Sequence, residues 1–282
     1  MSTKVYEIIT EKILAELEKG VVPWVQPWIG GRAKNLISKK DYTGINTFLL
    51  GCQKYSSPYW VSFKQCKDLG GNVKKGEHGS MIVFWKQITV RDKDHQDEEK
   101  RIPLLRYYLV WNTEQCEGID EKKIPQIEAN PNFQPIEACE ATINGMQNKP
   151  AINHEGSAAY YQPSTDNVYM PKKESFQDES FYYSVLFHEL AHSTGHEKRL
   201  DRKQAFMNNF GSEKYSKEEL CAEMTAAFLC NVHQIETTID NSVAYIQSWL
   251  KKLKDDPKMV VLAAAQAQKA ADYILNVKHE YN

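Results

Sequence analysis

The chain of 282 residues is 41% hydrophobic and 26% charged, which is typical of a folded globular protein and excludes disordered or fibrous classes. No run of about 18 apolar residues predicts a membrane helix or a secretion signal, so we expect a cytoplasmic protein with no membrane partner. The length favours two domains over one, and the six cysteines lack the Cys-x-x-Cys spacing of a thiolate zinc site.

The two parts of the chain carry opposite charge. Residues 1–111 hold 18 Lys and Arg against 12 Asp and Glu, a net charge of +6, whereas the remaining residues hold 17 against 25, a net charge of −8. A basic half favours a polyanionic partner such as nucleic acid, although an uneven spread of solvated surface charge would give the same asymmetry.

The first half begins with an amphipathic helix. Apolar residues recur at helical spacing over residues 2–19, and Gly20 follows as a stop. Residues 80–90 and 104–111 are typical of strands, and the charged segment between them, residues 91–101, has no apolar face to bury. We therefore predict a β-hairpin with a charged tip, a tip that fits no motif.

The second half follows a linker. Residues 121–134 are interrupted by prolines and lack periodicity, which indicates an interdomain linker. After it, two short strand patterns separated by turn residues, 158–162 and 167–171, are typical of an antiparallel pair. Helices are expected over residues 136–146, 178–192, 216–231, 243–253 and 257–275. The predicted fold class is α+β with two domains, residues 1–120 and residues 135–282.

A metal-binding motif lies in the second of these helices. His188, Glu189 and His192 fit the pattern His-Glu-x-x-His, which on a helix places two imidazoles one turn apart on one face. The pair can hold one Zn²⁺ ion per chain, or another divalent ion, and Glu189 beside it can serve as the catalytic base. The alternative is that both histidines are satisfied by hydrogen bonds within the core.

Zinc needs a third protein ligand, and we predict Glu223. His196 follows Gly195, which breaks the helix, and a continuing helix would spread three imidazoles too far apart for one ion. Glu223 lies among small alanines on the next predicted helix, where two helices could approach closely. Glu219 has another role open to it, because Ser216-x-x-Glu219 fits a capping box, although Glu219 could also hold a zinc-bound histidine in place.

A peptidase also needs a donor for the oxyanion of the transition state. Tyr161 and His196 are candidates. The same candidacy extends to Tyr160, Tyr169, Arg199 and Arg202. A peptide substrate could lie along the edge of the strand over residues 167–171 by strand addition.

The basic half also carries aromatic and basic residues suited to single-stranded nucleic acid. Trp24 and Trp28, held in a loop by flanking prolines, are the predicted platforms on which unpaired bases stack. Lys74 and Lys75, in a glycine-rich loop, are the predicted phosphate contacts. The alternative is that tryptophans serve as core residues, which we expect of those on the strands.

Several motifs, taken in order, resemble those of the ArdC-type antirestriction proteins of plasmids and mobile elements. In the first half they are Pro23-Trp24-x-x-Pro27-Trp28, Tyr42-x-Gly44-x-Asn46, Trp60-x-x-Phe63-Lys64-Gln65, Lys75-Gly76-Glu77-x-Gly79 and Tyr108-x-Val110-x-Asn112-x-x-Gln115. In the second half they are Tyr160-Tyr161-x-Pro163-x-x-Asp166, the run from His188 to His196 with Arg199-Leu200, and Glu218-Glu219-Leu220-x-Ala222-Glu223. The resemblance covers nearly the whole chain.

This resemblance implies an N-terminal domain that binds single-stranded DNA and a zincin-like metallopeptidase domain. Together they would protect incoming DNA from host restriction during conjugation, with an unknown protein or peptide as the substrate. A related N-terminal domain also occurs in plasmid primases, but this sequence has no primase catalytic motif. The alternative function is a DNA-coating protein whose metal domain is structural or regulatory and cleaves no peptide bond.

Overall fold

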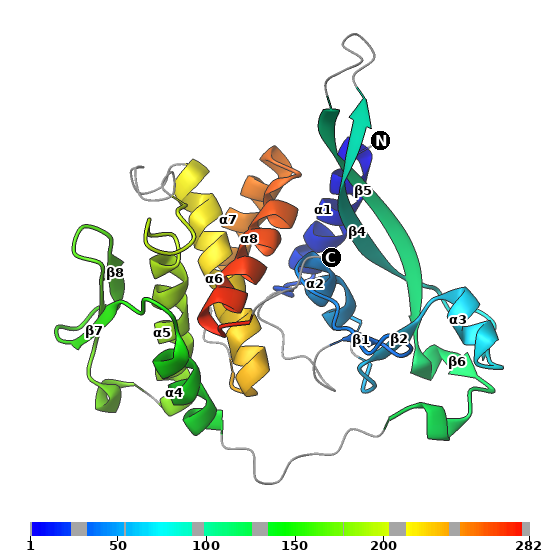
Figure 1. The fold of residues 1–282 in the computed structure, drawn as a ribbon, viewed down its shortest axis with the longest axis horizontal. Coiled ribbons are helices and arrows are strands. Elements are labelled where there is room, and N and C mark those ends of the chain that lie inside the picture. Colours follow the sequence, from blue (N-terminus) through cyan, green and yellow to red (C-terminus); the bar gives the residue numbers. More distant parts are fainter. Residues whose placement is uncertain are drawn as a thin grey trace.

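The computed structural model describes residues 2–23, 33–53, 55–91, 99–125, 135–176, 178–202, 213–236 and 243–277. Its architecture is α+β: a small sheet with a long hairpin lies on one side and a group of helices on the other (Figure 1). Each helix within these ranges is too short or too polar to cross a membrane.

The first half of the chain builds the small sheet. Its elements are α1 (Ser2–Glu18), β1 (Lys34–Asn35), α2 (Ile45–Gly51), β2 (Tyr59–Val61), α3 (Phe63–Asp68), β3 (Asn72–Val73), β4 (Ser80–Arg91), β5 (Glu99–Asn112), η1 (Thr113–Gln115), β6 (Cys116–Glu117) and η2 (Glu121–Lys123). The strand order is β1-β2-β5-β4, and β3 pairs separately with β6.

The predicted hairpin is formed by β4 and β5, which pair antiparallel along their length and project beyond the rest of the sheet (Figure 1). On its other side, β5 pairs with β2 only at Trp111 and Asn112. Among the described residues, the edge of β5 over residues 106–110 therefore has no strand partner.

The second half of the chain contributes most of the helices. Its elements are α4 (Pro135–Gly145), β7 (Ala151–His154), β8 (Tyr160–Gln162), β9 (Asn167–Met170), η3 (Lys173–Ser175), α5 (Glu179–Ser193), α6 (Glu213–His233), α7 (Val243–Asp255) and α8 (Met259–Ile274). These bounds agree closely with the helices expected from the sequence.

The small sheet of this half has the order β7-β9-β8. The antiparallel pairing of β8 with β9 confirms the predicted strand pair. On its other edge β9 pairs in parallel with β7, a strand that was not predicted from the sequence. Because both edges of β9 are occupied, the expected addition of a peptide substrate to the strand over residues 167–171 is wrong.

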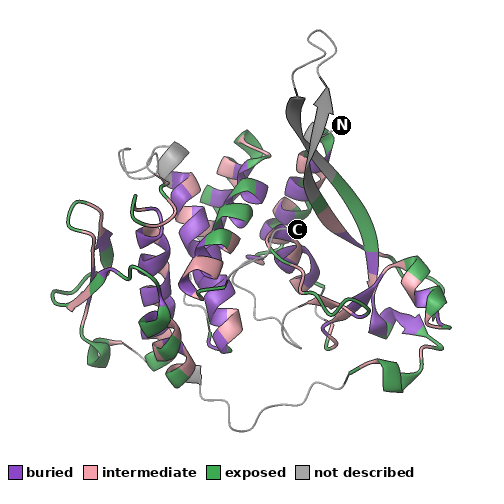
Figure 2. Ribbon diagram, in the orientation of Figure 1, coloured by how far each residue is buried: buried purple, intermediate pink, exposed green. Residues whose placement is uncertain are grey.

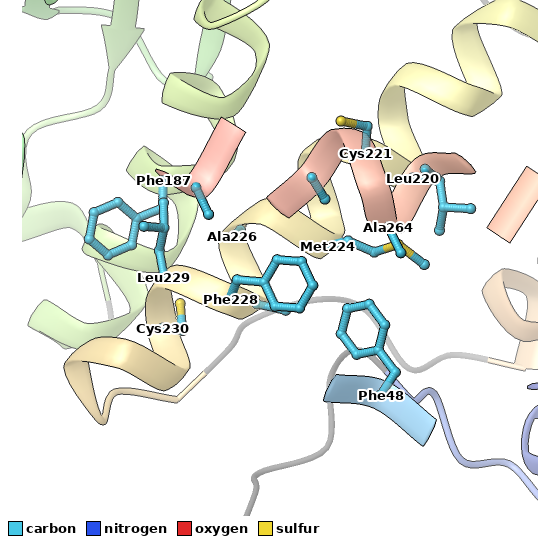
Figure 3. Packing of buried hydrophobic residues seen from close by; sticks show 14 of the residues in the cluster. Phe48, Phe187, Leu220, Cys221, Met224, Ala226, Phe228, Leu229, Cys230 and Ala264 are labelled. Carbon is cyan, nitrogen blue, oxygen red and sulfur yellow. The ribbon is translucent and has the colours of Figure 1, made fainter. Parts of the chain in front are cut away.

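Residues from both halves of the chain form the largest hydrophobic core. Helix α1 buries Ile9, Ile13 and Leu17, and it lies against α7 and α8. The Phe48 ring of α2 stacks on the Phe228 ring of α6, with centroids 4.8 Å apart (Figure 3). Figure 2 shows the buried residues gathered on the inward faces of these helices. The sheet side and the helical side of the molecule therefore share one core.

Helix α2 also connects this core to the hairpin. The amide of Asn46 makes two hydrogen bonds with the backbone of Val83 on β4: its Nδ2 donates to the carbonyl oxygen at 2.9 Å, and its Oδ1 accepts from the backbone N–H at 2.7 Å. Because the Asn46 amide both donates a hydrogen bond to β4 and accepts one from it, these bonds hold the base of the hairpin against α2.

Candidate metal centre

The core holds helix α5, which carries the His-Glu-x-x-His motif, in place. The helix begins after Asp178, whose carboxylate accepts a hydrogen bond from the backbone N–H of Phe181 at 2.8 Å. Further along, Phe187 and Leu190 are fully buried. A capped and buried helix fixes the positions of the motif residues relative to their neighbours.

Three side chains converge beside α5. The Nε2 atoms of His188 and His192 lie 3.1 Å apart. Helix α6 supplies Glu219, with one carboxylate oxygen 3.6 Å from Nε2 of His188 and the other 3.5 Å from Nε2 of His192. Within the described ranges, this is the one group of three or more potential metal ligands.

The spacing of these atoms fits a single metal ion. Ligand atoms bound at about 2.0–2.1 Å to a tetrahedral ion lie about 3.3–3.4 Å apart, and the measured separations of 3.1, 3.5 and 3.6 Å are close to that value. Two imidazoles and one carboxylate are also the ligand set of thermolysin-like zinc hydrolases, which leaves one coordination position open. The three side chains can therefore hold a divalent ion and still admit a substrate.

The structure places Glu219, and not the predicted Glu223, in this triad. Glu223 lies one turn further along α6, where its carboxylate accepts a hydrogen bond from the phenol of Tyr245 on α7. The predicted capping box is also wrong, because α6 begins at Glu213 and Ser216 lies within the helix. Glu219 therefore does not have the capping role that had argued against it as a metal ligand.

The predicted catalytic base, Glu189, is buried on α5 directly after His188. It lies close enough to His192 for its charge to help raise the pKa of that imidazole. The carboxylate therefore lies at the triad, where a base would be needed, and its catalytic role stays a prediction.

A further carboxylate, Glu218, holds His192 from the other side. Its Oε1 lies 3.6 Å from Nδ1 of His192, and the guanidinium of Arg202 donates to both of its oxygens, at 2.6 and 3.1 Å. Arg202 is itself fixed by Thr194 Oγ1 at 2.7 Å and by the carbonyl of Ala191 at 3.0 Å. This arrangement fixes the ring so that Nε2 faces the triad.

These carboxylates change the protonation of His192. Burial opposes a charge on the imidazole, but the hydrogen bond to Glu218 and the charges of Glu219 and Glu189 outweigh it and raise the pKa to about 9. Since a metal binds neutral imidazole, metal binding at neutral pH must displace a proton from His192. The role of Glu218 was not predicted from the sequence, although two adjacent acidic residues in a helix that is otherwise mostly buried were a signal for it.

Tyr161 and His196, the candidate transition-state donors, lie around Asp166. The Tyr161 hydroxyl donates to this carboxylate at 2.9 Å, and the fully buried guanidinium of Arg199 also donates to it. His196 Nδ1 accepts from the backbone N–H of Lys198 at 3.2 Å and lies 3.9 Å from Asp166. The cluster ties the β8–β9 turn to the segment after α5, and the catalytic roles of both residues stay predictions.

Of the four predicted DNA-contacting residues, the structure describes the two lysines but not the two tryptophans. Trp24 and Trp28 lie outside the described residues. Lys74 and Lys75 are both exposed, and the ammonium of Lys74 donates to the carbonyl of Glu114 at 2.8 Å. The two lysines are therefore accessible to a ligand from solvent.

Both halves of the chain match known protein families. The model described as the N-terminal domain of anti-restriction factor ArdC matches residues 3–111, and that described as a zincin-like metallopeptidase matches residues 137–266. The uncharacterized protein y4eC of Sinorhizobium fredii (strain NBRC 101917 / NGR234) is 34% identical over 96% of this chain and 92% of its own length. Two DNA primases TraC of Escherichia coli are 32% and 33% identical over 96% of this chain, but over only 27% and 20% of their own lengths.

Two crystal structures of the antirestriction protein ArdC from plasmid R388 are similar to this fold. The metal-free structure has a TM-score of 0.77 at 35% identity and covers 95% of this chain and 96% of that one. The Mn(II)-bound structure has a TM-score of 0.77 at 34% identity and covers 98% of this chain and 99% of that one. With the converging triad, these matches establish that the chain belongs to the ArdC-type antirestriction proteins, with an ArdC N-terminal domain followed by a zincin-like metallopeptidase domain.

Proposed function

We propose that this protein protects transferred DNA from host restriction, binding single-stranded DNA with its N-terminal half and hydrolysing a peptide bond at a zinc ion. The observation that carries the proposal is the convergence of His188, His192 and Glu219 beside the buried Glu189. A site that only stabilised the fold would have no need of a carboxylate next to an open metal position.

The residues of the chain have distinct tasks in this reaction. His188, His192 and Glu219 would hold the zinc ion, which when bound polarises a carbonyl group and makes water more acidic. Glu189 takes a proton from the attacking water and returns it to the leaving nitrogen. Glu218 keeps the His192 ring in its ligating orientation.

Zinc is proposed from the donor set, because imidazole nitrogen and carboxylate oxygen both suit this ion. The same donors also suit other divalent metals, and the related ArdC of plasmid R388 has been crystallised with Mn(II). Metal analysis of protein purified without added metal is the direct measurement of which ion the site selects.

Binding of single-stranded DNA is supported by charge and by exposed aromatic rings. Residues 1–111 carry 18 basic against 12 acidic side chains. In this half, about half of the side-chain surface of Phe63, Tyr107 and Tyr108 is exposed to solvent. Basic surface combined with open aromatic faces is what unpaired nucleotides require, since phosphates need charge and bases need surfaces on which to stack.

The test of the peptidase is the substitution Glu189→Gln. Glutamine fills the same space but cannot accept a proton, so the variant should retain metal and fold while losing hydrolysis. New protein N-termini would be compared in cell extract treated with the native protein, with Glu189→Gln, and with Glu179→Gln, which changes an exposed glutamate on the same helix. Equal cleavage by native protein and Glu189→Gln would refute the assignment, and loss of metal would make Glu189 structural.

A second candidate function is DNA coating by a protein whose metal domain is structural or regulatory. The observation that favours it is the shared core, in which α6 carries both Glu219 and the Phe228 ring that stacks on Phe48 of the first half. In that case, protection of DNA in a transfer assay would survive Glu189→Gln but not the loss of a ligand in Glu219→Ala.

A further inference from the structure

A hollow of about 610 Å³ lies on the N-terminal half, between α3 and the edge of β5 that has no strand partner. Consecutive residues of β5, from Tyr107 to Trp111, line it together with Phe63 and Lys64 at the start of α3. Because successive side chains of a strand point to opposite faces, a lining by consecutive residues means that the hollow opens over the strand edge.

The walls of this hollow are aromatic and open. The side chains of Phe63, Tyr107 and Tyr108 are 52%, 50% and 49% exposed, although large aromatic side chains are usually buried. Phe63 packs edge-on against Trp111, with ring centroids 5.9 Å apart. The rings are therefore held at the hollow while much of their surface remains uncovered.

The hollow is also lined by a basic side chain and by polar side chains. Lys64 lines the hollow, and the ammonium of Lys67 lies 5.8 Å from the centroid of the Phe63 ring. Asn35 and Gln65 donate to each other's carbonyl oxygen at 3.1 and 3.3 Å, and Asn35 also donates to the hydroxyl of Tyr42 at 3.3 Å. The hydroxyl of Tyr42 thus keeps its own hydrogen for an acceptor in the hollow.

We propose that this hollow binds the unpaired bases of single-stranded DNA, with Phe63 and Tyr107 as stacking surfaces and Lys64 as a phosphate contact. The inference rests on the proposed binding of single-stranded DNA and names the place where it occurs. The volume lies within the range of about 300–1,000 Å³ typical of small-molecule sites and therefore admits a nucleoside-sized group. Bases in a duplex are already stacked and cannot reach such walls.

Base stacking distinguishes this site from simple charge attraction. The native full-length protein should bind an oligothymidylate more tightly than an abasic strand of the same length, since only the first offers bases to the aromatic rings. Phe63→Ala or Tyr107→Ala should weaken oligothymidylate binding by about five- to 150-fold and leave abasic binding unchanged. Lys64→Ala should weaken both equally and reduce the salt dependence.

The matched control is Phe84→Ala. Phe84 lies on the same hairpin and is 48% exposed, but it does not line the hollow. It lies opposite Arg106, whereas Tyr107 lies opposite Val83, so Phe84 and Tyr107 occupy opposite faces of the pair. The control should bind both strands as the native protein does.

Fluorescence anisotropy measures the affinity of each variant for both strands, and circular dichroism shows whether each variant is folded. If the native protein binds the oligothymidylate but Phe63→Ala and Tyr107→Ala bind it equally well, the hollow is refuted and the proposed DNA binding stands. Equal losses in Phe84→Ala and Phe63→Ala would point to the whole hairpin surface and also refute the hollow. If the native protein binds no single strand, both proposals fail.

Discussion

The metal centre and the aromatic hollow are built in opposite ways. At the metal centre, buried helices fix every important atom: Glu218 and Arg202 hold His192, and the triad atoms lie within 4.8 Å of one another. At the hollow, side chains such as Phe63 and Tyr107 are about half exposed and contact the ligand through ring surfaces. Loss of a metal ligand at the first site should therefore act nearly all-or-none, and loss of a ring at the second should be graded.

The strongest test of this contrast is to remove the third ligand. Glu219→Ala should abolish metal retention, because two imidazoles alone make a weak site and the loss of even an indirect contact typically costs about 10–100-fold in affinity. Glu223→Ala, the matched change one turn along α6, should retain the metal. Metal content after dialysis against a weak chelator is the measurement. Retention by Glu219→Ala and loss by Glu223→Ala would reverse the assignment of the ligand.

The next largest effect is expected on the stability of the metallopeptidase domain, from the ion pair between Asp166 and Arg199. In the native protein, burial opposes ionisation of Asp166, but hydrogen bonds from Arg199 and Tyr161 outweigh it and hold the pKa of this carboxyl below its usual value. Asp166→Asn leaves the buried Arg199 without its counter-charge, and the free energy of unfolding at neutral pH should fall by about 3–5 kcal/mol.

The pH dependence of that loss has a definite sign. A carboxyl with a depressed pKa stabilises the fold fully above its ordinary pKa of about 4, and this contribution disappears as the pH falls through the folded-state pKa. Native protein should therefore lose more stability on acidification than Asp166→Asn does. Urea unfolding at several pH values measures this, with the exposed Asp255→Asn as control. Parallel pH curves for native protein and Asp166→Asn would contradict it.

A smaller effect is expected from the side chain that orients a ligand without touching the metal. Glu218→Gln keeps the shape but removes the charge next to Nδ1 of His192, and it should weaken metal binding about tenfold. Competition with a fluorescent chelator gives the affinity. Glu236→Gln, an exposed glutamate beyond the end of α6, is the control. An unchanged affinity in Glu218→Gln would show that the α5 backbone alone positions the ring.

The smallest effect belongs to the basic loop next to the sheet. Lys75→Ala should lower affinity equally for every single-stranded sequence and reduce the slope of log affinity against log salt by about 0.7 if the lysine contacts one phosphate. Lys251→Ala, which changes an exposed lysine of α7 in the second half, should leave both the affinity and the salt slope unchanged. A loss confined to one base sequence would mean that Lys75 contacts a base.

The parts of the site that were predictable are those set by local spacing. His188 and His192 lie one turn apart in any α-helix, so the motif alone placed them together. The choice between Glu219 and Glu223 depends on how α6 lies along α5, because residues four apart share one helix face. That register is a tertiary property, and the apparent capping box at Ser216 pointed away from the correct glutamate.

The fold shows the same limit. The helices and the β4–β5 hairpin follow from periodicity. The parallel pairing of β7 with β9, however, joins two segments that are separated in the chain by a turn and by β8, and no local sequence pattern indicates such a pairing. The partner of α1 was also not predictable: its apolar stripe showed that it packs against something, and the structure shows that α7 and α8 cover it.

The shared core has a consequence for how such proteins evolve. Detaching residues 1–120 would strip α1 of its cover and expose Ile9, Ile13 and Leu17 to water, so a gene that acquired only this part would encode a poorly soluble product. Recombination should therefore transmit both halves as a single inherited block. The match to the TraC primases has this form, since it spans 96% of this chain inside much longer polypeptides.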